Sequence, residues 1–428
     1  MHSDIYDLIG VGIGPFNLSL AALLGPLDRP LIKFYDNKKS FDWHPELLLD
    51  NAPMQTSFLK DLVTPVQPTN PYSYLNYLVS CGQFYHFLNT GRDVITRLEF
   101  NHYLKWCSEQ LSDLLEFDSP VLDVKYQDGL FKVIKSSGET FTRNLCVASG
   151  PVPFIPECSK PFIGESVFHA KSKHLKGVSL QNKKVLVVGG GQTGLEVFRN
   201  VLNEKWGKSQ NVTLITGRDN LLPLDEGPFT NEIFTPQFVS EFYELNQDSK
   251  DKFTKSLLLT SDGNTPSYLA DFYNELYLDK FYKKSFSDYT ISPKRWLETI
   301  SKKNNEYEVT IRNTLSDQCH SFNVDVIILA TGFTSGLPNY LDSLKEDVLF
   351  DDRGRLCISR DYKLRTKFKE NNIYMMNYSR HGHGIADPQT SLMSWRSAVI
   401  ANDLLGESKF KNTNNQSSFI DYFTEGRM

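Results

Sequence analysis

Two glycine-rich turns are the parts of this sequence whose residue types and spacing are best suited to chemistry. One follows a short apolar run at residues 5–9, and the other follows a similar run at 184–188. Glycines allow a tight turn and let the backbone approach a pyrophosphate, while the following helix presents free N–H groups to the phosphates. The glycines of the two turns at the fingerprint positions, or in the case of Gly14 just before one, are Gly10, Gly12, Gly14, Gly189, Gly191 and Gly194. Both turns therefore predict dinucleotide sites, although the first has Pro15 at its third fingerprint position.

The residue after the second strand of each unit indicates which nucleotide that unit binds. In the first unit, a strand expected at 31–35 ends at Asp36, 26 residues after Gly10. A carboxylate at about this spacing can bind ribose hydroxyls. In the second unit, a strand expected at 212–215 is followed by Arg218 in place of an acid. Because an arginine can pair with a 2′-phosphate, the second site is predicted to bind NADPH.

Each turn needs a strand before it and a helix after it. The helices are expected at 16–24 and 195–203, and further apolar strands at 144–150 and 325–333 end in small residues. Three prolines within 151–156 predict a linker, and the segment 236–292, with a single glycine, predicts a mainly helical insertion. The pattern predicts an α/β fold with two Rossmann-like dinucleotide-binding domains, typical of a flavoprotein that takes hydride from NADPH.

Composition narrows the class of protein further. The chain has 428 residues and a net charge of −5, with 46 basic and 51 acidic side chains and no long basic run, so nucleic acid is not an expected partner. Its six cysteines form no C-x-x-C pair, which disfavours a dithiol flavin reductase and a zinc site, and no metal is expected. The N-terminus lacks a signal-peptide pattern and no apolar run is long enough to span a bilayer, so we expect a cytoplasmic protein without a membrane partner.

Longer motifs resemble those of the flavin-dependent N-hydroxylating monooxygenases of siderophore synthesis, most of all the bacterial L-lysine N6-hydroxylases. The resemblance extends from about residue 7 to 403. The family motif D-x3-L-A-T-G-[YF]-x4-[HP] is met from Asp325 to Pro338. The other matching stretches are residues 10–17, 42–45, 54–62, 68–73, 189–194, 231–236, 260–263 and 383–386.

This resemblance implies FAD in the first site, NADPH in the second, and O₂ and an amine as substrates. NADPH would reduce the flavin, O₂ would add to give a flavin hydroperoxide, and the side-chain amine of L-lysine would attack its distal oxygen. No catalytic nucleophile of the protein is needed, since the cofactor supplies the reactivity. The domains implied are 1–160 with 336–428 for FAD, 161–235 with 293–335 for NADPH, and 236–292 as a small helical substrate domain. A homo-oligomer, a tetramer in this family, is also implied.

Site residues carry over from the family position by position. Lys60 resembles the lysine that pairs with the substrate carboxylate, and Ser391 resembles a serine near the substrate at the flavin. The positions implied to lie beside a cofactor are Trp43, His44, Gln55, Arg218, His383 and Gly384. Without the resemblance, Lys60 would be a solvated surface lysine, and Ser391 an N-cap of the helix expected at 392–405.

Three alternatives remain open. The first alternative is L-ornithine as the substrate. Hydroxylases of L-ornithine tend to carry asparagine where this chain has Ser261, which favours lysine. A diamine, cadaverine or putrescine, would leave the Lys60 cation without a carboxylate partner, which would be costly in a buried site. The third alternative, a nucleotide-binding redox sensor without turnover, is disfavoured because motifs for flavin, NADPH and substrate occur together.

Overall fold

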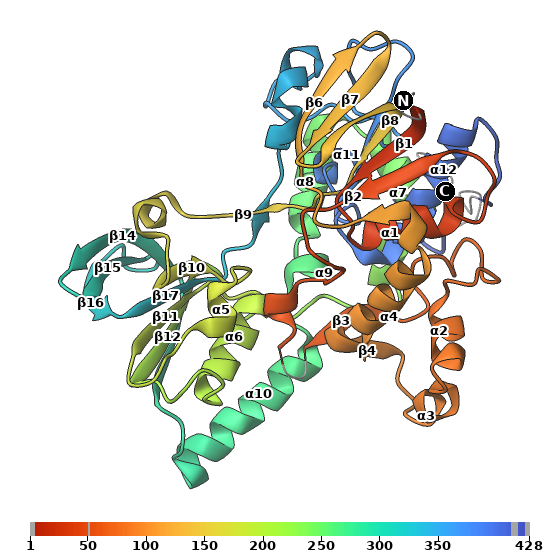
Figure 1. Ribbon diagram of the computed structural model, residues 1–428. Coiled ribbons are helices and arrows are strands. Elements are labelled where there is room, and N and C mark those ends of the chain that lie inside the picture. Colours follow the sequence, from red (N-terminus) through yellow and green to blue (C-terminus); the bar gives the residue numbers. More distant parts are fainter. Residues whose placement is uncertain (1–4, 50–51, 412–417, 424–428) are drawn as a thin grey trace.

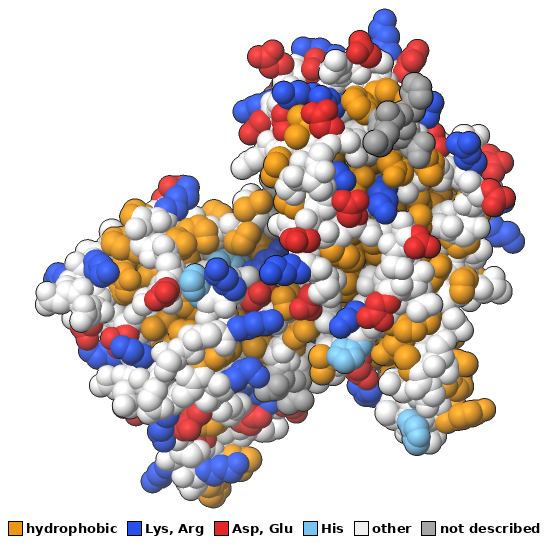
Figure 2. Space-filling model, viewed as in Figure 1, with side chains coloured by type: hydrophobic (Ala, Val, Ile, Leu, Met, Phe, Trp, Pro, Cys, Tyr) orange, Lys and Arg blue, Asp and Glu red, His pale blue; other side chains and the backbone are white. Residues whose placement is uncertain are grey.

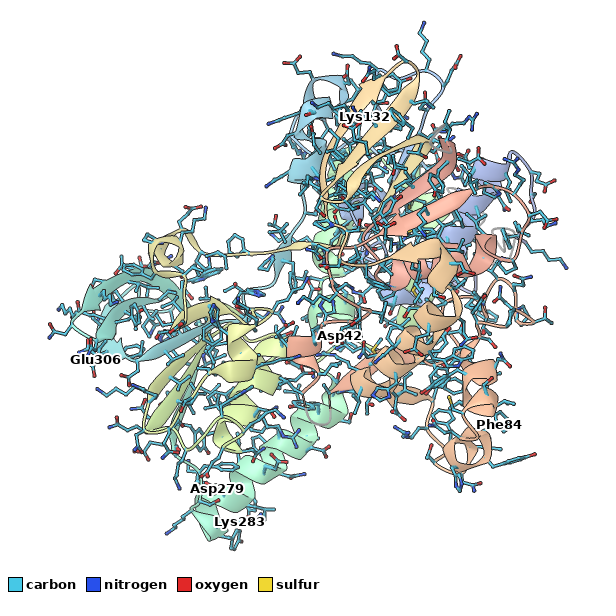
Figure 3. The ribbon with its side chains drawn as sticks, in the orientation of Figure 1. Asp42, Phe84, Lys132, Asp279, Lys283 and Glu306 are labelled. Carbon is cyan, nitrogen blue, oxygen red and sulfur yellow. The ribbon has the colours of Figure 1, made fainter. Side chains whose placement is uncertain are left out.

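The computed structural model describes residues 5–49, 52–411 and 418–423. The chain forms two lobes, each built on its own sheet with a parallel centre (Figure 1). The space-filling view shows these lobes as separate masses that meet along a boundary (Figure 2). Asp42 lies near this boundary, whereas Lys132 and Glu306 lie far out on the two lobes (Figure 3).

The first lobe contains the first glycine turn. Its sheet runs in the order β5-β2-β1-β8-β7-β6, and β19 also pairs with β8. Its strands are β1 (Ile5–Val11), β2 (Ile32–Tyr35), β5 (Leu115–Glu116), β6 (Val121–Gln127), β7 (Leu130–Lys135), β8 (Gly138–Val147) and β19 (Ile373–Met375). The strands β2, β1, β8 and β19 pair in parallel. Helix α1 (Pro15–Leu24) follows β1 and packs against α12 (Met393–Leu405), so the end of the chain completes this lobe.

The second lobe repeats this arrangement around the second glycine turn. Its sheet is parallel throughout, in the order β10-β17-β11-β12-β13, and α6 (Gln192–Leu202) follows β11. The strands are β10 (Val167–His169), β11 (Lys184–Val188), β12 (Asn211–Thr216), β13 (Asp288–Pro293) and β17 (Val326–Leu329). An antiparallel sheet of β14 (Arg295–Lys303), β15 (Glu306–Asn313) and β16 (Cys319–Val324) packs beside it. The predicted class, α/β with two dinucleotide-binding units, is confirmed.

The chain passes between the lobes along two paired segments. The proline-rich linker expected at 151–156 contains β9 (Val152–Pro153), which pairs antiparallel with β18 (Phe333–Thr334). Figure 1 shows β9 extended between the two lobes. This part of the connection between the lobes is therefore a double strand.

The segment 236–292 is helical only in part. It begins with α7 (Pro236–Tyr243), α8 (Gln247–Ser256), α9 (Leu259–Asp262) and α10 (Pro266–Leu278), and a π-helical turn, η5 (Asp279–Lys283), follows. Residues 288–292, expected to be helical, instead belong to β13 (Asp288–Pro293) at the edge of the second sheet. Helix α10 buries Tyr268 and Phe272 in the core of the second lobe, whereas α7 packs on the loop that carries Ile385. The helices thus bridge the lobes.

The first lobe carries further elements besides its sheet, α1 and α12. They are η1 (Pro45–Leu47), β3 (Pro53–Ser57), α2 (Tyr74–Ser80), α3 (Phe84–Leu88), β4 (Val94–Thr96), α4 (Arg97–Gln110) and η2 (Ser112–Leu114). The other short elements are η3 (Glu157–Phe162), α5 (His174–Gly177), η4 (Thr230–Phe234), η6 (Asn339–Asp347), α11 (Arg380–His383) and η7 (Thr390–Leu392). Among the described residues, no helix has the length and apolar character needed to cross a bilayer.

Candidate functional site

The first glycine turn has the geometry of a phosphate cradle. Gly12 has a φ of +91°, and a Cβ there would lie 2.7 Å from the Ala148 carbonyl oxygen, so only glycine fits. A Cβ on Gly14 would meet nothing within 4 Å, so this side of the turn is open. Gly14 is also the N-cap of α1, whose N-terminus has no side-chain cap. The turn and the free helix N-terminus fit the pyrophosphate of a dinucleotide.

Asp36 closes this turn. Its buried carboxylate accepts hydrogen bonds from the backbone N–H of Ile13 (2.6 Å) and of Lys38 (2.8 Å). The amide of Asn17 supports the turn from the other side by donating to the Gly12 carbonyl (2.8 Å). Asp36 therefore holds the turn in shape, and its contact with a ribose stays a prediction.

The second glycine turn is tighter still. A Cβ on Gly189, whose φ is +125°, would lie 2.1 Å from the Ala330 carbonyl oxygen, and one on Gly194 would lie 1.9 Å from the Gly189 carbonyl oxygen. Gly191 is the N-cap of α6, again without a side-chain cap. The Arg218 guanidinium lies 3.7 Å from the position of a Cβ on Gly191, so it stands beside the open face of the turn.

Arg218 is held in this place by the backbone of the helical insertion. One guanidinium nitrogen, Nη1, donates to the Asp262 carbonyl (2.6 Å), and the Asp262 carboxylate in turn pairs with Arg380 of the first lobe (3.2 Å). The remaining N–H groups of Arg218 can serve a phosphate. The turn and the arginine together fit a dinucleotide that carries a 2′-phosphate.

A cavity of about 730 Å³ lies where residues from several parts of the chain meet at the lobe boundary. Its walls come from β3 and β4, the start of α4, the segment 224–234, residues 260–261 and the loop 388–391. Four residues predicted for the site line it: Trp43, Gln55, Lys60 and Ser391. The structure thus brings together side chains that are more than 300 positions apart in sequence.

Lys60 is half-buried in this cavity. Burial lowers the pKa of its ammonium, and the nearby carboxylate of Asp93 raises it. Within the described residues, the ammonium has no ion-pair or hydrogen-bond partner. A partly desolvated cation without a partner is costly, so it is available for an anionic group of a ligand. The alternative of a fully solvated surface lysine does not fit this placement.

Ser391, on the loop 388–391 of the cavity wall, also has a polar group without a partner among the described residues. Its hydroxyl is buried and has no hydrogen-bond partner in the described part of the chain. It does not cap α12, because that helix begins at Met393 and its N-cap is Leu392. The N-cap alternative for Ser391 is therefore wrong, and the residue instead lines the cavity, with its hydroxyl buried in the wall.

The other cofactor-side positions lie in different surroundings. Gln55 is exposed, and its amide donates to Thr265 Oγ1 (3.4 Å). Trp43 packs edge-on against Phe100 (ring centroids 5.2 Å apart). His44 has a left-handed backbone, and its pKa is lowered to about 3 by burial and by nearby cations, so its ring is neutral at physiological pH.

His383 and Gly384 do not line the cavity. The His383 ring is buried, stacks on Tyr362 (4.2 Å between centroids) and contacts Ser379 Oγ through Nδ1 (2.6 Å). Burial lowers its pKa to about 3. Gly384 has a φ of +80°, and a Cβ there would lie 3.2 Å from the Phe242 ring. Packing accounts for both residues, and their contact with a cofactor stays a prediction.

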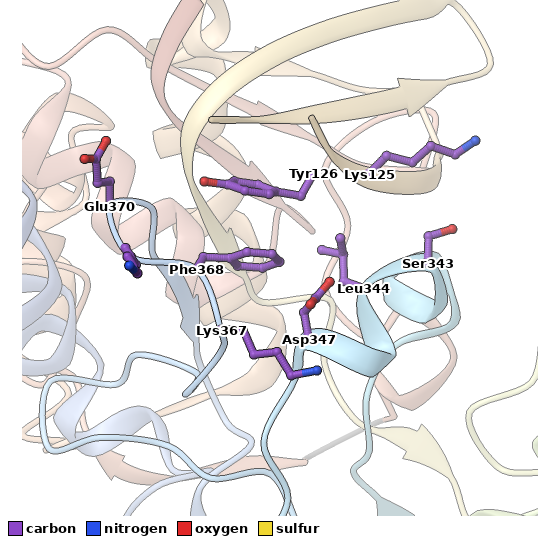
Figure 4. A pocket seen from close by; sticks show the side chains of 9 residues that line it. Lys125, Tyr126, Ser343, Leu344, Asp347, Lys367, Phe368 and Glu370 are labelled. Carbon is purple, nitrogen blue, oxygen red and sulfur yellow. The ribbon is translucent and has the colours of Figure 1, made fainter. Parts of the chain in front are cut away.

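A second hollow, of about 750 Å³, lies in the first lobe between β6, η6 and the segment 367–370. Figure 4 shows Tyr126 and Phe368 with their rings facing each other in its wall. Its lining mixes lysines with acids and includes none of the predicted site residues. The hollow at the lobe boundary is therefore the candidate active site.

Known proteins resemble this chain over almost its whole length. Residues 4–335 match the model of the L-lysine 6-monooxygenase/L-ornithine 5-monooxygenase family. An L-lysine N6-monooxygenase of Escherichia coli is 39% identical over 407 residues, which cover 94% of this chain and 95% of that protein. The chain belongs to this monooxygenase family.

Solved structures of related enzymes agree with the fold and the predicted cofactors. A cadaverine monooxygenase of Erwinia amylovora, bound to FAD, has a TM-score of 0.91 at 27% identity and covers 99% of this chain and all of that one. An ornithine N-hydroxylase of Kutzneria, with reduced FAD, NADP⁺ and L-ornithine, has a TM-score of 0.87 at 27% identity, covering 94% of this chain and 99% of that one. The predictions of a flavin monooxygenase with FAD and NADPH are thereby confirmed.

Two charged residues at the site of this monooxygenase escaped the sequence analysis. Arg97 lines the cavity and reaches across the boundary to Glu196, a fully buried residue of α6 (2.9 Å). Burial raises the pKa of the Glu196 carboxyl, and Arg97 and Gln192 oppose this. No local pattern could reveal the pair, because its members are 99 positions apart and belong to different lobes.

Proposed function

We propose that this enzyme N-hydroxylates the side-chain amine of L-lysine, with FAD in the first lobe, NADPH in the second and O₂ as co-substrate. The product would be a hydroxylamine for hydroxamate siderophore biosynthesis. The observation that carries the proposal is Lys60, a half-buried cation in the cavity at the lobe boundary that has no partner among the described residues. A substrate carboxylate would supply the missing counter-charge.

The protein's own groups would bind and orient the substrate. Lys60 would hold the carboxylate at one end, and the unused Ser391 hydroxyl would hydrogen-bond the reacting amine at the other. FAD, once reduced by NADPH, supplies the activation of O₂. The amine must be neutral to use its lone pair, whereas a free lysine amine has a pKa of roughly 10.4. A cavity that lowers the pKa of Lys60 by burial would lower that of a substrate amine in the same way.

We also propose the cofactor contacts of the individual residues. Asp36, Trp43, His44 and Gln55 would serve FAD together with the first glycine turn, and Arg218 would bind the 2′-phosphate of NADPH at the second. The FAD-binding domain would comprise residues 1–160 and 336–428. The NADPH-binding domain would comprise residues 161–235 and 293–335, together with β13. The helices between 236 and 283 would close the amine site.

A diamine or L-ornithine is the alternative substrate. A diamine would place a second ammonium near Lys60, and like charges at close range repel each other. Ornithine keeps the carboxylate but is one methylene shorter, so its amine would stop short of the position that the lysine amine reaches. Both considerations favour lysine.

The test is a product assay with the purified, FAD-loaded enzyme. Hydroxylamine formed from L-lysine, L-ornithine, cadaverine and putrescine would be measured alongside NADPH consumption. The proposal expects kcat/KM to be highest for L-lysine. Hydroxylamine from diamines alone would refute it, and NADPH oxidation without hydroxylamine from any amine would support the sensor alternative instead.

A further inference from the structure

Two opposite charges line the substrate cavity beside the two-stranded sheet of β3 and β4 in the first lobe. Lys60 follows β3 and Asp93 precedes β4, and both residues line the cavity. The strands pair antiparallel, with Ser57 opposite Val94. Lys60 and Asp93 are 33 positions apart in sequence, but the pairing of β3 with β4 places them in the same part of the wall.

Hydrogen bonds fix this part of the wall. The Ser57 hydroxyl donates to Asp93 Oδ1 (2.6 Å), and the Phe58 N–H donates to the Asp93 carbonyl (3.0 Å). The Lys60 N–H donates to the Ser57 carbonyl (3.0 Å), so Lys60 is tied to the same turn. The carboxylate of Asp93 and the backbone of Lys60 are thereby held in the same small region of the wall.

The two charges lie close enough to interact but form no ion pair with each other. The carboxylate of Asp93 raises the pKa of Lys60, yet no nitrogen-to-oxygen approach within 4.0 Å joins them in the described structure. One oxygen of Asp93, Oδ2, accepts no hydrogen bond from the described residues. The wall therefore offers one cation and one anion, side by side and both available.

An α-amino acid head group presents the complementary pair of charges on a single carbon. We propose that Asp93 receives the α-ammonium of the substrate while Lys60 receives its carboxylate. This inference rests on the proposed function and extends it, because it makes the enzyme select a zwitterionic head group. Two contacts at the head group and a third at the reacting amine would also distinguish the L from the D enantiomer.

Asp93 fits this role better than the other acids of the cavity. Asp225 and Glu226 belong to the segment 224–234, away from the β3–β4 pair beside which Lys60 lies. The Asp225 carboxylate also faces the hydroxyl of Thr230 (3.5 Å). Asp225 therefore provides a matched control, since it is an exposed aspartate in the same cavity.

The experiment compares the wild-type enzyme with Asp93→Asn and Asp225→Asn, all loaded with FAD. Asparagine keeps the oxygen that accepts the hydrogen bond from the Ser57 hydroxyl, so the local structure at β3 and β4 is retained. The ligands are L-lysine, 6-aminohexanoate, which lacks the α-ammonium, and cadaverine, which lacks the carboxylate. For ligands that turn over slowly, the inhibition constant against L-lysine replaces kcat/KM.

We expect Asp93→Asn to lower kcat/KM for L-lysine by roughly 10- to 100-fold, because a charge-assisted hydrogen bond is lost. Its effect on 6-aminohexanoate should stay within about 2-fold, because that ligand has no group for Asp93. Asp225→Asn should affect L-lysine and 6-aminohexanoate to the same extent, and the wild-type preference for L- over D-lysine should shrink only in Asp93→Asn.

Two outcomes would overturn the inference. An equal loss with L-lysine and 6-aminohexanoate would mean that Asp93 only supports the structure, and no loss with either would mean that the α-ammonium binds elsewhere. In both cases the wild type would still hydroxylate L-lysine, so the proposed function would stand. Failure of the proposed function is seen separately, as a wild type that hydroxylates only diamines.

Discussion

The charge on Lys60 is the single group on which the choice of substrate depends most. Its ammonium lies in the cavity, is half-buried and has no partner in the described structure. Such a cation favours any ligand that brings a carboxylate and disfavours one that brings a second positive charge. Its removal should therefore affect substrates differently, according to whether they carry an anion.

Lys60→Ala should lower kcat/KM for L-lysine by roughly 30- to 1000-fold, equivalent to about 2–4 kcal/mol, because the substrate carboxylate loses its partner. Cadaverine should lose little or even gain. FAD content and the rate of flavin reduction by NADPH should hardly change. Steady-state kinetics with both substrates test this, with Lys105→Ala, an exposed lysine of α4, as the control. Equal losses for both substrates would refute a carboxylate contact.

Arg218 should decide between the two nicotinamide cofactors. Arg218→Ala should raise KM for NADPH by about 10- to 100-fold, because a bond to a charged phosphate is lost, and should leave KM for NADH nearly constant. Arg312→Ala, which removes a partly exposed arginine paired with Glu298 on the second lobe, serves as the control. Stopped-flow flavin reduction with each cofactor measures the effect. A parallel rise for NADH would show that Arg218 supports the turn instead of reading the phosphate.

The sequence motifs predicted which residues line the site better than they predicted the burial and the partners of those residues. The motifs identified Lys60 and Ser391, but only the structure shows that their polar groups have no partner among the described residues. The same motifs included His383, which the fold buries against Tyr362 outside the cavity. Burial and distance between remote segments decide such outcomes, and a single sequence does not contain them.

At the scale of elements, the two strand–turn–helix units agree closely with the sequence. The strand expected at 184–188 is β11 to the residue, and the helices expected after both turns begin within three residues of α1 and α6. Glycine turns between apolar runs are local signals, which explains this accuracy. The strand β13 was missed because its place depends on pairing with β12, whose paired residues are 77 positions away in sequence.

Gly194→Ala should damage the second unit alone. The added Cβ would lie 1.9 Å from the Gly189 carbonyl oxygen, so the turn and α6 must move apart. We expect flavin reduction by NADPH to slow by at least about 10-fold, because the phosphate cradle is displaced. FAD content and chemical reduction of the flavin by dithionite should be retained.

The matched control for this change is Gly177→Ala at the end of α5, where an added Cβ would meet nothing within 4 Å. A Gly194→Ala enzyme that binds and oxidises NADPH normally would show that the turn tolerates displacement. Loss of FAD in Gly194→Ala would show instead that the two units do not fold independently.

At the scale of the whole molecule, the relation of the two lobes is set by contacts that lie outside both glycine turns. Leu47, Leu49 and Ala52 of the first lobe are buried in the core of the second. The ion pair between Arg97 and Glu196 crosses the same boundary. The sequence predicted the two lobes and their linker, whereas these contacts arise only when the lobes meet. The homotetramer implied by the family resemblance stays a prediction.

The Arg97–Glu196 pair should couple the lobes, since Glu196 is fully buried and the side chain of Arg97 is only 16% exposed. Glu196→Leu should lower the free energy of unfolding by about 3 kcal/mol, because it leaves the Arg97 cation without its partner in a desolvated place. The double variant Arg97→Met/Glu196→Leu should recover most of this loss, because it removes both charges and retains apolar volume.

A double-mutant cycle compares the wild type, Glu196→Leu, Arg97→Met and the double variant. Their four free energies of unfolding come from denaturant unfolding, followed by circular dichroism and by the fluorescence of released FAD. Limited proteolysis at the linker 151–156 reports on the lobe boundary at the same time. If the lobes are held by this pair, the single variants should be cleaved faster at the linker than the double variant. Strictly additive free energies, with equal cleavage in all variants, would show that the apolar contacts of Leu47 and Leu49 suffice to dock the lobes.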